Sequence, residues 1–329
     1  MKNNNWAEAV NFLQEGDRFL VVSHIHPDGD AIGSTCAVAS ILDQLGKSYT
    51  LINASGVPEK FAFLSHSKRI LTPEQVREGD PFSRVVAVDV ADAERMGDIE
   101  PFIAEDGHIL NIDHHPTNDR FGAVNLIIDH AASTTEILCQ LADELGLTWD
   151  LILAESLYTG LLTDTGGFRY ANTTPAVMKL ASRLLAVGVD AAGIADRTLE
   201  TMTQNQLQLL QRSLDTLTFA DEGRIAWMWL SRQDFIMTGA NENDMDGIVN
   251  YARNVVGVDV GILFRETSTG DVKASLRSRE IVDVGALAQS LGGGGHARAA
   301  GCTLRGSRNE VERRLLDQVK QRLREGSES

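Results

Sequence analysis

Residues 18–34 read Arg-Phe-Leu-Val-Val-Ser-His-Ile-His-Pro-Asp-Gly-Asp-Ala-Ile-Gly-Ser, an apolar run that ends abruptly in a cluster of histidines and carboxylates. Residues 19–22 are a short apolar run without a helical period, which predicts a buried strand. Apolar side chains then recur on one face of residues 31–45, which predicts a helix. Three polar residues follow the strand at its carboxyl end, where open α/β sheets bind their ligands: His24, Asp28 and Asp30.

Asp28 and Asp30 form an electrostatically costly pair, because only one residue separates their like charges. A bound cation is the simplest compensation, and His24 would then be a third ligand. The alternative is that Asp28 caps the helix and His24 is an ordinary hydrogen-bonded polar residue. Asp is a favoured N-cap and Pro-Asp-Gly is a common turn, so this stretch alone leaves both interpretations open.

Two later stretches repeat the pattern of an apolar strand that ends in acids or imidazoles. A strand at 84–88 leads to Asp89, and a strand at 108–112 leads to the triplet Asp-His-His at 113–115. Helical stretches alternate with these strands, which predicts an α/β domain with a doubly wound, mostly parallel sheet. Because the carboxyl ends of parallel strands lie on one side of a sheet, we expect these side chains to converge there.

Two helix ends add further candidates. The sequence Ser133-Thr-Thr-Glu predicts a helix N-terminus with a capping box, and this N-terminus could also hold a phosphate with Ser133 as a ligand. An apolar helix over 151–163 leads to Asp164. Asp164 is either a turn residue at the end of that helix or a fourth acid at the same sheet edge, and its local sequence leaves both interpretations open.

The length of 329 residues predicts two domains, because one core rarely serves so long a chain. We predict a catalytic domain over 1–190, a helical linker over 191–218, and a smaller α+β substrate-binding domain with a mixed sheet over 219–329. The linker is predicted from a polar helical pattern with an apolar thread. Trp227 and Trp229 lie on one face of a predicted strand and are expected to pack in the second core.

The composition indicates the cellular compartment of the protein. The three cysteines, Cys36, Cys139 and Cys302, are far apart, which predicts a reduced protein without a disulfide framework. No apolar run approaches the length of a membrane span, and the first residues lack the apolar core of a secretion signal. We therefore expect a cytoplasmic protein without a membrane partner. Composition leaves the oligomeric state open, a homodimer included.

The charge distribution bounds the substrate. The net charge of −16 argues against a protein that coats long nucleic acid through a basic field. Residues 265–325 are the exception, with 12 Lys and Arg against 8 Asp and Glu, a local net charge of +4. This asymmetry fits a short anionic substrate handled by two unlike domains.

A glycine run at 292–295 lies in this basic segment. Glycine lets the backbone approach a nucleotide closely and direct N–H groups at phosphate, although such a run is also typical of a flexible turn. Arginines flank the run, and their planar guanidinium groups bind phosphate through paired contacts. We therefore predict a clamp for a substrate phosphate or base at Arg277, Arg279, Gly293, Gly294, Gly295, His296 and Arg298.

The acid and imidazole candidates in the first domain exceed what one tetrahedral zinc site needs, and they suit two divalent ions that share a carboxylate. Mixed oxygen and imidazole ligands favour Mn²⁺, with Mg²⁺ or Co²⁺ as substitutes. Such a pair of ions supports phosphoester hydrolysis without a nucleophilic Ser or Cys. The candidate ligands are His24, Asp28, Asp30, Asp89, His114 and Asp164.

These motifs resemble those of a known family. The motifs His24-x-x-x-Asp28-x-Asp30, Asp89, Asp113-His114-His115 and Asp164-Thr165-Gly166 are similar to the four motifs of the DHH phosphoesterases. The segment Gly293-Gly294-Gly295-His296, followed by Ala299-Ala300-Gly301, resembles the signature of the DHH-associated C-terminal domain. The resemblance covers nearly the whole chain. Within the family it is strongest to the short two-domain type that acts as an oligoribonuclease and phosphoadenosine-phosphate phosphatase.

The resemblance also implies a role for each position. It assigns one Mn²⁺ to His24 and Asp28, the other to Asp30, His114 and Asp164, and the bridge between them to Asp89. His115 would contact the scissile phosphate or orient the site, which makes it catalytic together with Asp89 and His114. Asp113 would fix the tautomer of a neighbouring imidazole.

We predict a cytoplasmic, Mn²⁺-dependent hydrolase that degrades short RNA to mononucleotides and converts 3′-phosphoadenosine 5′-phosphate to AMP. Short substrates follow from the small second domain and the acidic body, because neither offers a long basic track. Three alternatives keep the metal site but change the substrate: linear dinucleotides from cyclic signalling nucleotides, inorganic polyphosphate, and single strands as in the longer RecJ nucleases. A nucleotide sensor without catalytic activity is the fourth alternative.

Overall fold

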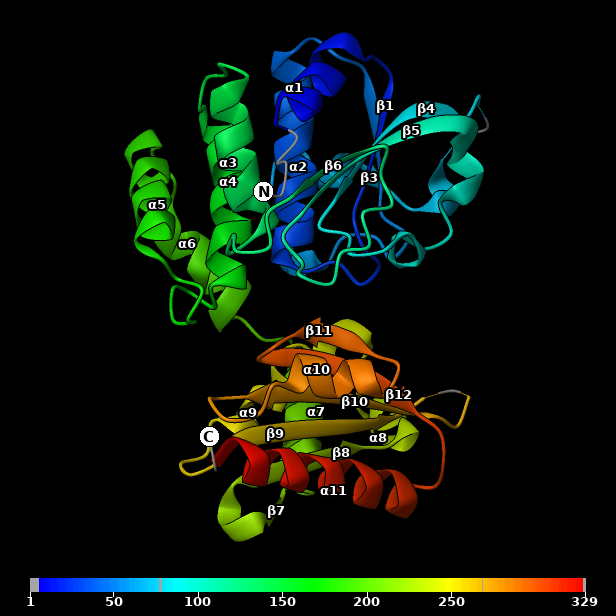
Figure 1. Cartoon of the computed structure of the whole chain (residues 1–329), viewed down its shortest axis with the longest axis vertical. Coiled ribbons are helices and arrows are strands. Elements are labelled where there is room, and N and C mark those ends of the chain that lie inside the picture. Colours follow the sequence, from blue (N-terminus) through cyan, green and yellow to red (C-terminus); the bar gives the residue numbers. More distant parts are fainter. Residues whose placement is uncertain (1–5, 77–78, 268, 328–329) are drawn as a thin grey trace. The chain divides into compact units, whose positions relative to one another are not determined.

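The computed structural model describes residues 6–76, 79–267 and 269–327. The chain divides into two compact units, Met1–Thr201 and Met202–Ser329 (Figure 1). The boundary between them falls inside the stretch 191–218 that we predict as the linker. Within the described ranges, no helix combines the length and the apolar character needed to cross a membrane.

The first unit is built on a six-stranded sheet. Its strands are β1 (Phe19–Val22), β2 (Tyr49–Ile52), β3 (Ile70–Leu71), β4 (Phe82–Val88), β5 (Ile103–Asp113) and β6 (Val124–Ile127). Its α-helices are α1 (Trp6–Glu15), α2 (Gly29–Gln44), α3 (Thr134–Glu144), α4 (Leu151–Asp164), α5 (Pro175–Val187) and α6 (Ala191–Ala195). Short 3₁₀ helices occupy Glu59–Phe61, Ser67–Arg69, Pro73–Gln75, Ala93–Met96 and Glu100–Phe102, and a π-helix occupies Asp196–Glu200.

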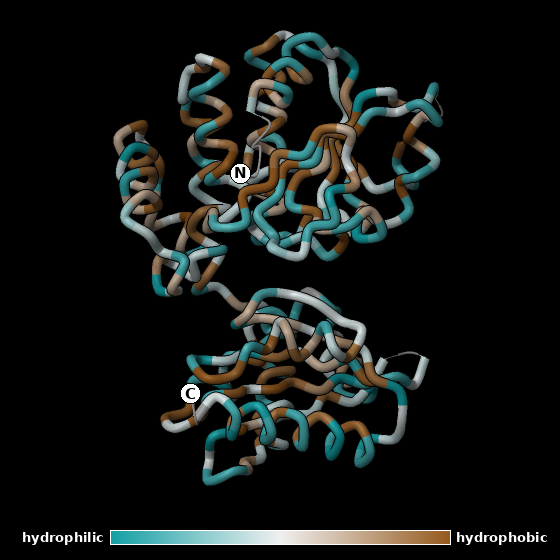
Figure 2. Tube along the Cα trace, viewed as in Figure 1, coloured by the Kyte–Doolittle hydropathy of each residue, from teal (hydrophilic) through white to brown (hydrophobic). Residues whose placement is uncertain are grey.

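The strands of this sheet pair in parallel in the order β3-β2-β1-β4-β5-β6, which confirms the predicted α/β fold. β1 lies between β2 and β4, so it is buried on both faces and reads as a continuous apolar run. Phe19 and Val21 pack in the core with the α-helices, whereas Leu20 and Val22 pack in the opposite core with the 3₁₀ segments. Figure 2 shows hydrophobic residues concentrated along these inner strands.

Helices α2 and α4 pack against each other at very short range, because glycines lie in their interface. A Cβ atom on Gly33 of α2 would come within 2.7 Å of the Ser156 carbonyl oxygen of α4. Contact this close requires glycine at position 33. The packing brings the first turn of α2 and the last turn of α4 to the same edge of the sheet, where Asp30 and Asp164 lie.

The second unit has a mixed six-stranded sheet in the order β11-β12-β10-β9-β8-β7, in which only β8 and β9 pair in parallel among the described residues. This confirms the predicted α+β architecture. The strands are β7 (Thr218–Ala220), β8 (Ile225–Leu230), β9 (Val260–Glu266), β10 (Val272–Ser278), β11 (Gly294–His296) and β12 (Ala299–Leu304). The α-helices are α7 (Gln204–Leu214), α8 (Arg232–Thr238), α9 (Ile248–Arg253), α10 (Val284–Ser290) and α11 (Arg308–Ser327), and 3₁₀ helices occupy Asp221–Gly223 and Glu242–Met245.

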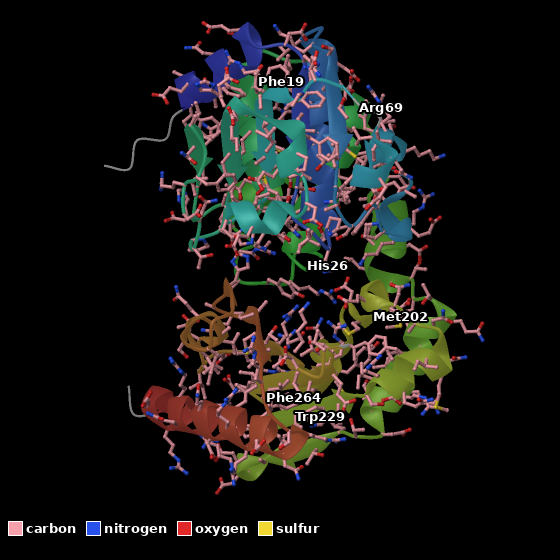
Figure 3. All side chains as sticks on the ribbon, turned by 90° about the vertical axis from the view of Figure 1, so that its right-hand side faces the viewer. Phe19, His26, Arg69, Met202, Trp229 and Phe264 are labelled. Carbon is pink, nitrogen blue, oxygen red and sulfur yellow. The ribbon has the colours of Figure 1, made fainter. Side chains whose placement is uncertain are left out.

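Trp227 and Trp229 of β8 both lie in the buried core between this sheet and helices α10 and α11, as predicted. The Trp229 ring stacks on Phe264 of β9 with 4.6 Å between ring centroids (Figure 3). The indole nitrogen of Trp229 donates a 2.6 Å hydrogen bond to Glu312 of α11. The pair therefore serves packing in this unit, and its polar atom has a partner inside the protein.

The predicted linker stretch 191–218 is not one continuous helix. Helix α6 continues into the π-helix, which ends at Glu200; Thr201 is extended, and α7 begins at Gln204. Thr203 caps α7, because its side chain accepts a 2.9 Å hydrogen bond from the backbone N–H of Gln206. The apolar thread that predicts one helix is therefore divided by a capping residue, and Thr218, the last residue of the predicted linker, already belongs to β7.

Candidate metal centre and active site

Three neighbouring strands of the first unit end at one edge of the sheet. β1 leads to His24, β4 leads to Asp89, and β5 leads to His114, and parallel pairing of β4 with both other strands brings these ends together. Asp89 has a φ angle of +59°, a left-handed conformation that Asp tolerates better than most residues. Backbone strain of this kind concentrates at functional sites.

His24, Asp28 and Asp89 form a first cluster, in which one ligand atom from each residue lies within 4.8 Å of the others. Nε2 of His24 lies 3.3 Å from Asp89 Oδ2 and 3.9 Å from Asp28 Oδ1. Nδ1 of His24 lies 2.7 Å from the carbonyl oxygen of Ile25, which favours a proton on Nδ1. In the neutral ring Nε2 then presents a lone pair to the carboxylates, as a metal ligand requires.

Asp30, Asp89 and His114 form a second cluster with the same 4.8 Å limit. Nε2 of His114 lies 3.2 Å from Asp164 Oδ2, 3.6 Å from Asp89 Oδ1 and 4.0 Å from Asp30 Oδ2. Nδ1 of His114 lies 3.3 Å from the carbonyl oxygen of Ala131, which again favours the proton on Nδ1. Asp89 belongs to both clusters, and it presents one oxygen to each.

The electrostatics of the site fit bound cations. Burial raises the pKa values of Asp30 and Asp164 well above their usual range, and the charges of the neighbouring carboxylates raise them further. Burial lowers the pKa of His24, but hydrogen bonds with Asp28 and Asp89 outweigh burial and raise it to about 10. Protons are therefore retained where several carboxylates lie close together, and a divalent ion in each cluster would replace them. The donor set fits such ions, because it mixes imidazole nitrogen with carboxylate oxygen.

Asp28 combines the two roles that its local sequence leaves open. Its Oδ1 accepts 3.0 Å hydrogen bonds from the backbone N–H groups of Asp30 and Ala31, so Asp28 is the N-cap of α2. Its side chain is nevertheless 57% exposed, in contrast to the buried His24 and Asp89. The capping hydrogen bonds hold the carboxylate in place without removing it from solvent, which makes capping and metal binding compatible.

Ser133 is the N-cap of α3 and is completely buried. Its hydroxyl accepts a 3.0 Å hydrogen bond from Glu136 N–H and lies 2.8 Å from the Thr135 hydroxyl. The predicted capping box is only half formed, because the Glu136 carboxylate accepts from Ala132 N–H and not from Ser133. The structure thus places Ser133 in the capping role, and its predicted contact with substrate would require this helix end to open.

His115 packs edge-on against His114 and shares Asp89 with it, but its shortest contact is to Asp113. Its Nδ1 lies 2.7 Å from Oδ1 of the fully buried Asp113 and 3.6 Å from Asp89 Oδ1. Burial lowers the pKa of His115, but the hydrogen bond and the charge of Asp113 raise it above its usual value, with Asp89 adding to the rise. The raised pKa therefore favours the positively charged form of His115 beside the carboxylates.

The glycine run of the second unit is more ordered than a flexible turn. Gly294 to His296 form β11, which pairs with β12. A Cβ atom on Gly293 would lie 2.2 Å from the Gly301 carbonyl oxygen, and one on Gly295 would lie 2.5 Å from that of Ala299. Close packing of the two strands therefore requires glycine at these positions, whether or not a nucleotide approaches them.

The three predicted substrate-binding arginines contact backbone carbonyl groups of their own unit. Arg277 donates to Leu276 at 3.0 Å, and Arg298 donates to Val282 at 2.9 Å. Arg279 lies beyond the end of β10, so it does not share a strand face with Arg277. It donates 3.2 Å hydrogen bonds to the two carbonyl groups of residues 253 and 254 at the end of α9. Arg279 therefore also caps that helix.

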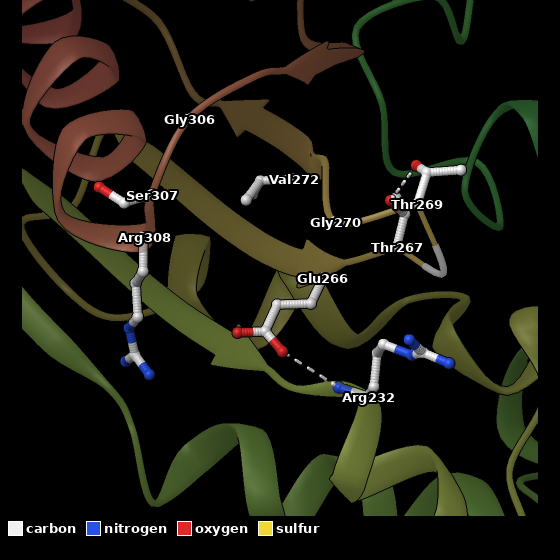
Figure 4. Close-up of a pocket in the computed structure, with 9 residues that line it drawn as sticks. All are labelled: Arg232, Glu266, Thr267, Thr269, Gly270, Val272, Gly306, Ser307 and Arg308. Atoms are coloured by element: carbon white, nitrogen blue, oxygen red, sulfur yellow. Dashed lines mark hydrogen bonds between the residues drawn. The ribbon is translucent and has the colours of Figure 1, made fainter.

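A surface pocket of about 420 Å³ in the second unit contains none of the predicted site residues. Figure 4 shows that the guanidinium groups of Arg232 and Arg308 point in different directions and that Glu266 contacts the backbone of Arg232. The lining residues are Arg232, Glu266, Thr267, Thr269, Gly270, Val272, Gly306, Ser307 and Arg308. Its charged groups do not converge on one point.

Sequence reasoning missed the polar residues that hold the predicted ligands. Thr134 and Thr135 donate hydrogen bonds to Asp30, and Thr134 also donates one to Asp89. Asn118 donates a 2.7 Å hydrogen bond to Asp113. The doubled threonine after the cap and an asparagine three residues beyond His115 are the sequence signals for these contacts. The threonine signal is weak because Asp30 is more than 100 residues away in the chain, and the asparagine signal is weak because Asn is common in loops.

Comparison with known proteins identifies similar chains. Residues 18–161 match the DHH family, N-terminal domain, and residues 233–325 match the DHHA1 domain. The chain is 36% identical over 304 residues to the bifunctional oligoribonuclease and PAP phosphatase NrnA of Thermus thermophilus, with 92% of this chain and 89% of that protein covered. It is 26% identical over 314 residues to the protein of the same name from Bacillus subtilis, with 94% and 96% covered.

A solved structure shares the complete fold. The chain is similar to an exopolyphosphatase-related protein from Bacteroides fragilis with a TM-score of 0.84 and 25% sequence identity. The match covers 97% of this chain and 95% of that one. Both units therefore have counterparts in a single known protein.

Proposed function

The chain belongs to the DHH phosphoesterase family and carries a DHHA1 domain, and we propose on this basis that it is a Mn²⁺-dependent hydrolase of short oligoribonucleotides and of 3′-phosphoadenosine 5′-phosphate. The observation that carries the proposal is the position of Asp89, whose two carboxylate oxygens face two different imidazoles, His24 and His114. A carboxylate shared in this way suits two divalent ions a few Å apart. Both NrnA relatives are named for these two substrate classes.

The proposed ligands divide as the two clusters do. We assign one Mn²⁺ to His24 and Asp28 and the other to Asp30, His114 and Asp164, with Asp89 as the bridge. Bound there, the ions would stabilise charge on the phosphoryl group and activate the attacking water. Backbone carbonyl groups hold the proton of each ligand imidazole on Nδ1, so the chain itself keeps Nε2 directed at the centre.

We propose that His115 binds the phosphoryl or leaving-group oxygen of the substrate. Its raised pKa favours the imidazolium, which donates hydrogen bonds to an anion and can donate a proton to a leaving oxygen. Asp113 holds the ring through Nδ1, which makes Nε2 the nitrogen suited to that contact. His115 would thus supply a positive charge that carboxylate ligands cannot supply.

We propose that the basic segment of the second unit binds a substrate phosphate or base. The support is its local charge of +4 within an acidic chain and the presence of arginines on both sides of β11 in the sequence. The residues proposed for this contact are Arg277, Arg279, Gly293, Gly294, Gly295, His296 and Arg298. The buried free cysteines are compatible with the cytoplasmic location that we propose for this activity.

A second candidate substrate is inorganic polyphosphate. One observation favours it, the full-length similarity to the exopolyphosphatase-related protein from Bacteroides fragilis. A polyphosphate would place the same demands on the metal centre as a nucleotide does, because the phosphoryl group is common to both. It would differ in offering no base or ribose.

Chromatographic product analysis of the purified chain with Mn²⁺ tests the proposal. Three substrates are incubated separately: 3′-phosphoadenosine 5′-phosphate, a five-nucleotide RNA and inorganic tripolyphosphate. We expect AMP from the first and mononucleotides from the second, with Asp89→Asn as the inactive control. Phosphate release from tripolyphosphate alone would overturn the nucleotide assignment in favour of the second candidate.

A further inference from the structure

The first turn of α3 holds the carboxylate of Asp30. The backbone N–H of Thr134 donates a 2.6 Å hydrogen bond to Oδ2, and the backbone N–H of Thr135 donates a 3.0 Å hydrogen bond to Oδ1. The Thr135 hydroxyl donates a further bond of 2.9 Å to Oδ1. Both oxygens are engaged and Asp30 is completely buried, so its orientation is set by α3 although the residue itself belongs to α2.

A glycine of a third helix closes the space around this carboxylate. A Cβ atom on Gly160 of α4 would lie 2.5 Å from Asp30 Oδ1 and 2.6 Å from the Thr135 hydroxyl oxygen. Asp30 is therefore enclosed by α2, α3 and α4, and little space remains for another rotamer. The enclosure and the hydrogen bonds restrict the same side chain independently.

The same helix turn reaches the carboxylate shared by the two clusters. The Thr134 hydroxyl donates a 3.2 Å hydrogen bond to Asp89 Oδ1. The bond to Asp89 comes from the Thr134 side chain, whereas the bond from Thr134 to Asp30 comes from its backbone. Two consecutive residues thus fix the positions of two proposed ligands that lie 59 residues apart in the sequence.

Capping of α3 does not account for these contacts. Ser133 already serves as the N-cap, because its hydroxyl accepts the hydrogen bond from Glu136 N–H. The cap does not require the hydrogen bond that the Thr135 hydroxyl donates to Asp30. It also does not require the one that the Thr134 hydroxyl donates to Asp89. Each of these two hydroxyl groups donates its proton to a carboxylate of the centre, and the Thr135 oxygen also lies 2.8 Å from the Ser133 hydroxyl, which can donate to it.

We propose that Thr134 and Thr135 are positioning residues that preset Asp30 and Asp89 for divalent metal binding, an inference that rests on the metal centre of the proposed function. A carboxylate that is already oriented loses less conformational freedom when an ion binds, so affinity increases. Outer-shell partners of this kind contribute about 10- to 100-fold to metal affinity in other proteins. The threonines themselves donate to the ligands and do not touch the ion.

The test is a calorimetric titration of the metal-stripped full chain with Mn²⁺. Thr135→Val keeps the shape of the side chain and removes the hydroxyl, and we expect its dissociation constant for Mn²⁺ to rise about tenfold. Thr135→Ser restores the donor and is expected to bind within about threefold of the unchanged chain. Thr35→Val is the matched control, because the buried Thr35 hydroxyl donates only to the Ala31 carbonyl group of its own helix.

Thr134→Val provides a second, independent variant, because it removes the donor to Asp89 and leaves the backbone contact to Asp30. We expect this variant to bind Mn²⁺ more weakly than the unchanged chain does. The thermal unfolding temperature of its metal-free form should stay within a few degrees of that of the unchanged chain. It keeps the proposal testable if Thr135→Val fails to fold.

Unchanged Mn²⁺ affinity in the folded valine variants would overturn the positioning role, and a lowered unfolding temperature with unchanged affinity would assign the threonines to stability alone. Product analysis separates this outcome from failure of the proposed function. A chain that binds Mn²⁺ with the predicted threonine dependence but cleaves neither nucleotide substrate would support the positioning role and overturn the substrate assignment.

Discussion

Oδ1 of Asp113 lies 2.7 Å from Nδ1 of His115, and this contact orients the one imidazole of the site that is not a proposed metal ligand. The other oxygen of Asp113 accepts a 2.7 Å hydrogen bond from Asn118, whose amide group also donates to the Val90 carbonyl group. The carboxylate is fully buried between these partners. Asp113 therefore fixes the orientation of the His115 ring and stabilises a positive charge on it.

Asp113→Asn should lower kcat about 10- to 100-fold, because the amide can no longer hold the His115 imidazolium as the carboxylate does. The affinity for Mn²⁺, measured by calorimetry, should stay within about threefold, because Asp113 is not a proposed ligand. Steady-state kinetics with 3′-phosphoadenosine 5′-phosphate check the first expectation. A matching loss of Mn²⁺ would instead place Asp113 among the ligands.

Asp164→Asn should make the metal-free chain more stable while weakening its binding of Mn²⁺. Burial and neighbouring carboxylates raise the pKa of Asp164, so an ionised carboxylate there opposes folding at neutral pH, and a neutral amide removes that cost. The side chain is 21% exposed, which reduces the effect to an increase of about 2–4 °C in Tm. Calorimetric unfolding without and with Mn²⁺ measures both changes. A lower Tm in the metal-free variant would contradict the electrostatic account.

The metal-free chain should lose stability as the pH rises from about 6.5 to 8.5. The folded pKa of His24 is raised to about 10, above its usual 6.5, so its stabilising contribution is complete below 6.5 and decreases as the pH approaches 10. His115 also has a pKa raised above 6.5 and acts in the same direction within this range. The raised pKa values of Asp30 and Asp164 have the same sign, but the loss of stability that they cause begins at their usual pKa of 3.8.

Thermal unfolding across this pH range checks the expectation, with His24→Gln as the control that should show a smaller decrease. Excess Mn²⁺ should reduce the decrease in the unchanged chain, because metal binding is stronger where protons compete less. An increase of Tm with pH in the metal-free chain would contradict the assignment of a protonated His24.

Gly160→Ala should disturb the metal centre, and Gly33→Ala should disturb only the packing. Both glycines lie between α2 and α4, but only the Gly160 Cβ would meet Asp30, whereas the Gly33 Cβ would meet backbone of α4. We expect each variant to lose about 1–3 kcal/mol of unfolding free energy from overpacking. Calorimetry should show weaker Mn²⁺ binding in Gly160→Ala alone. Equal Mn²⁺ affinities in the two variants would separate Gly160 from the ligand geometry.

Arg298→Ala should raise KM for both nucleotide substrates with little change in kcat, because the proposed contact is to a part of the substrate that does not react. Arg305→Ala is the matched control, since the Arg305 side chain is 92% exposed in the same unit and outside the proposed clamp. Steady-state kinetics at saturating Mn²⁺ compare the two. A KM that is unchanged in Arg298→Ala, or equally raised in both variants, would remove Arg298 from the clamp.

The sequence predicts the fold and the meeting of the candidate ligands for one physical reason. Apolar strands that end in His24, Asp89 or Asp113 can each be recognised locally in the sequence. Parallel pairing then brings the ends of the three strands together at one edge of the sheet. The structure accordingly brings all six proposed ligands together, including Asp164 from the end of α4. Local pattern and global topology agree here, which is the condition under which sequence reasoning works.

The remaining features depend on contacts that no local pattern encodes. Asp30 and Thr135 are 105 residues apart, so their hydrogen bonds follow from the packing of α3 against α2. The glycine run forms an edge strand because its partner β12 follows immediately, whereas composition alone also fits a loop. In the predicted linker, one threonine cap divides a pattern whose periodicity is otherwise continuous.

The distribution of ligands along the chain also determines when the site can form. The first proposed ligand, His24, and the last, Asp164, are 140 residues apart, and they meet only when β1, β4, β5 and α4 have all assembled. A ribosome-bound fragment that ends before α4 holds the cluster of His24, Asp28 and Asp89 but lacks Asp164, so the second proposed metal site would still be incomplete in it. Occupation of both proposed sites would then be a late event in folding, and local opening of any one of these elements would weaken metal binding before the chain as a whole unfolds.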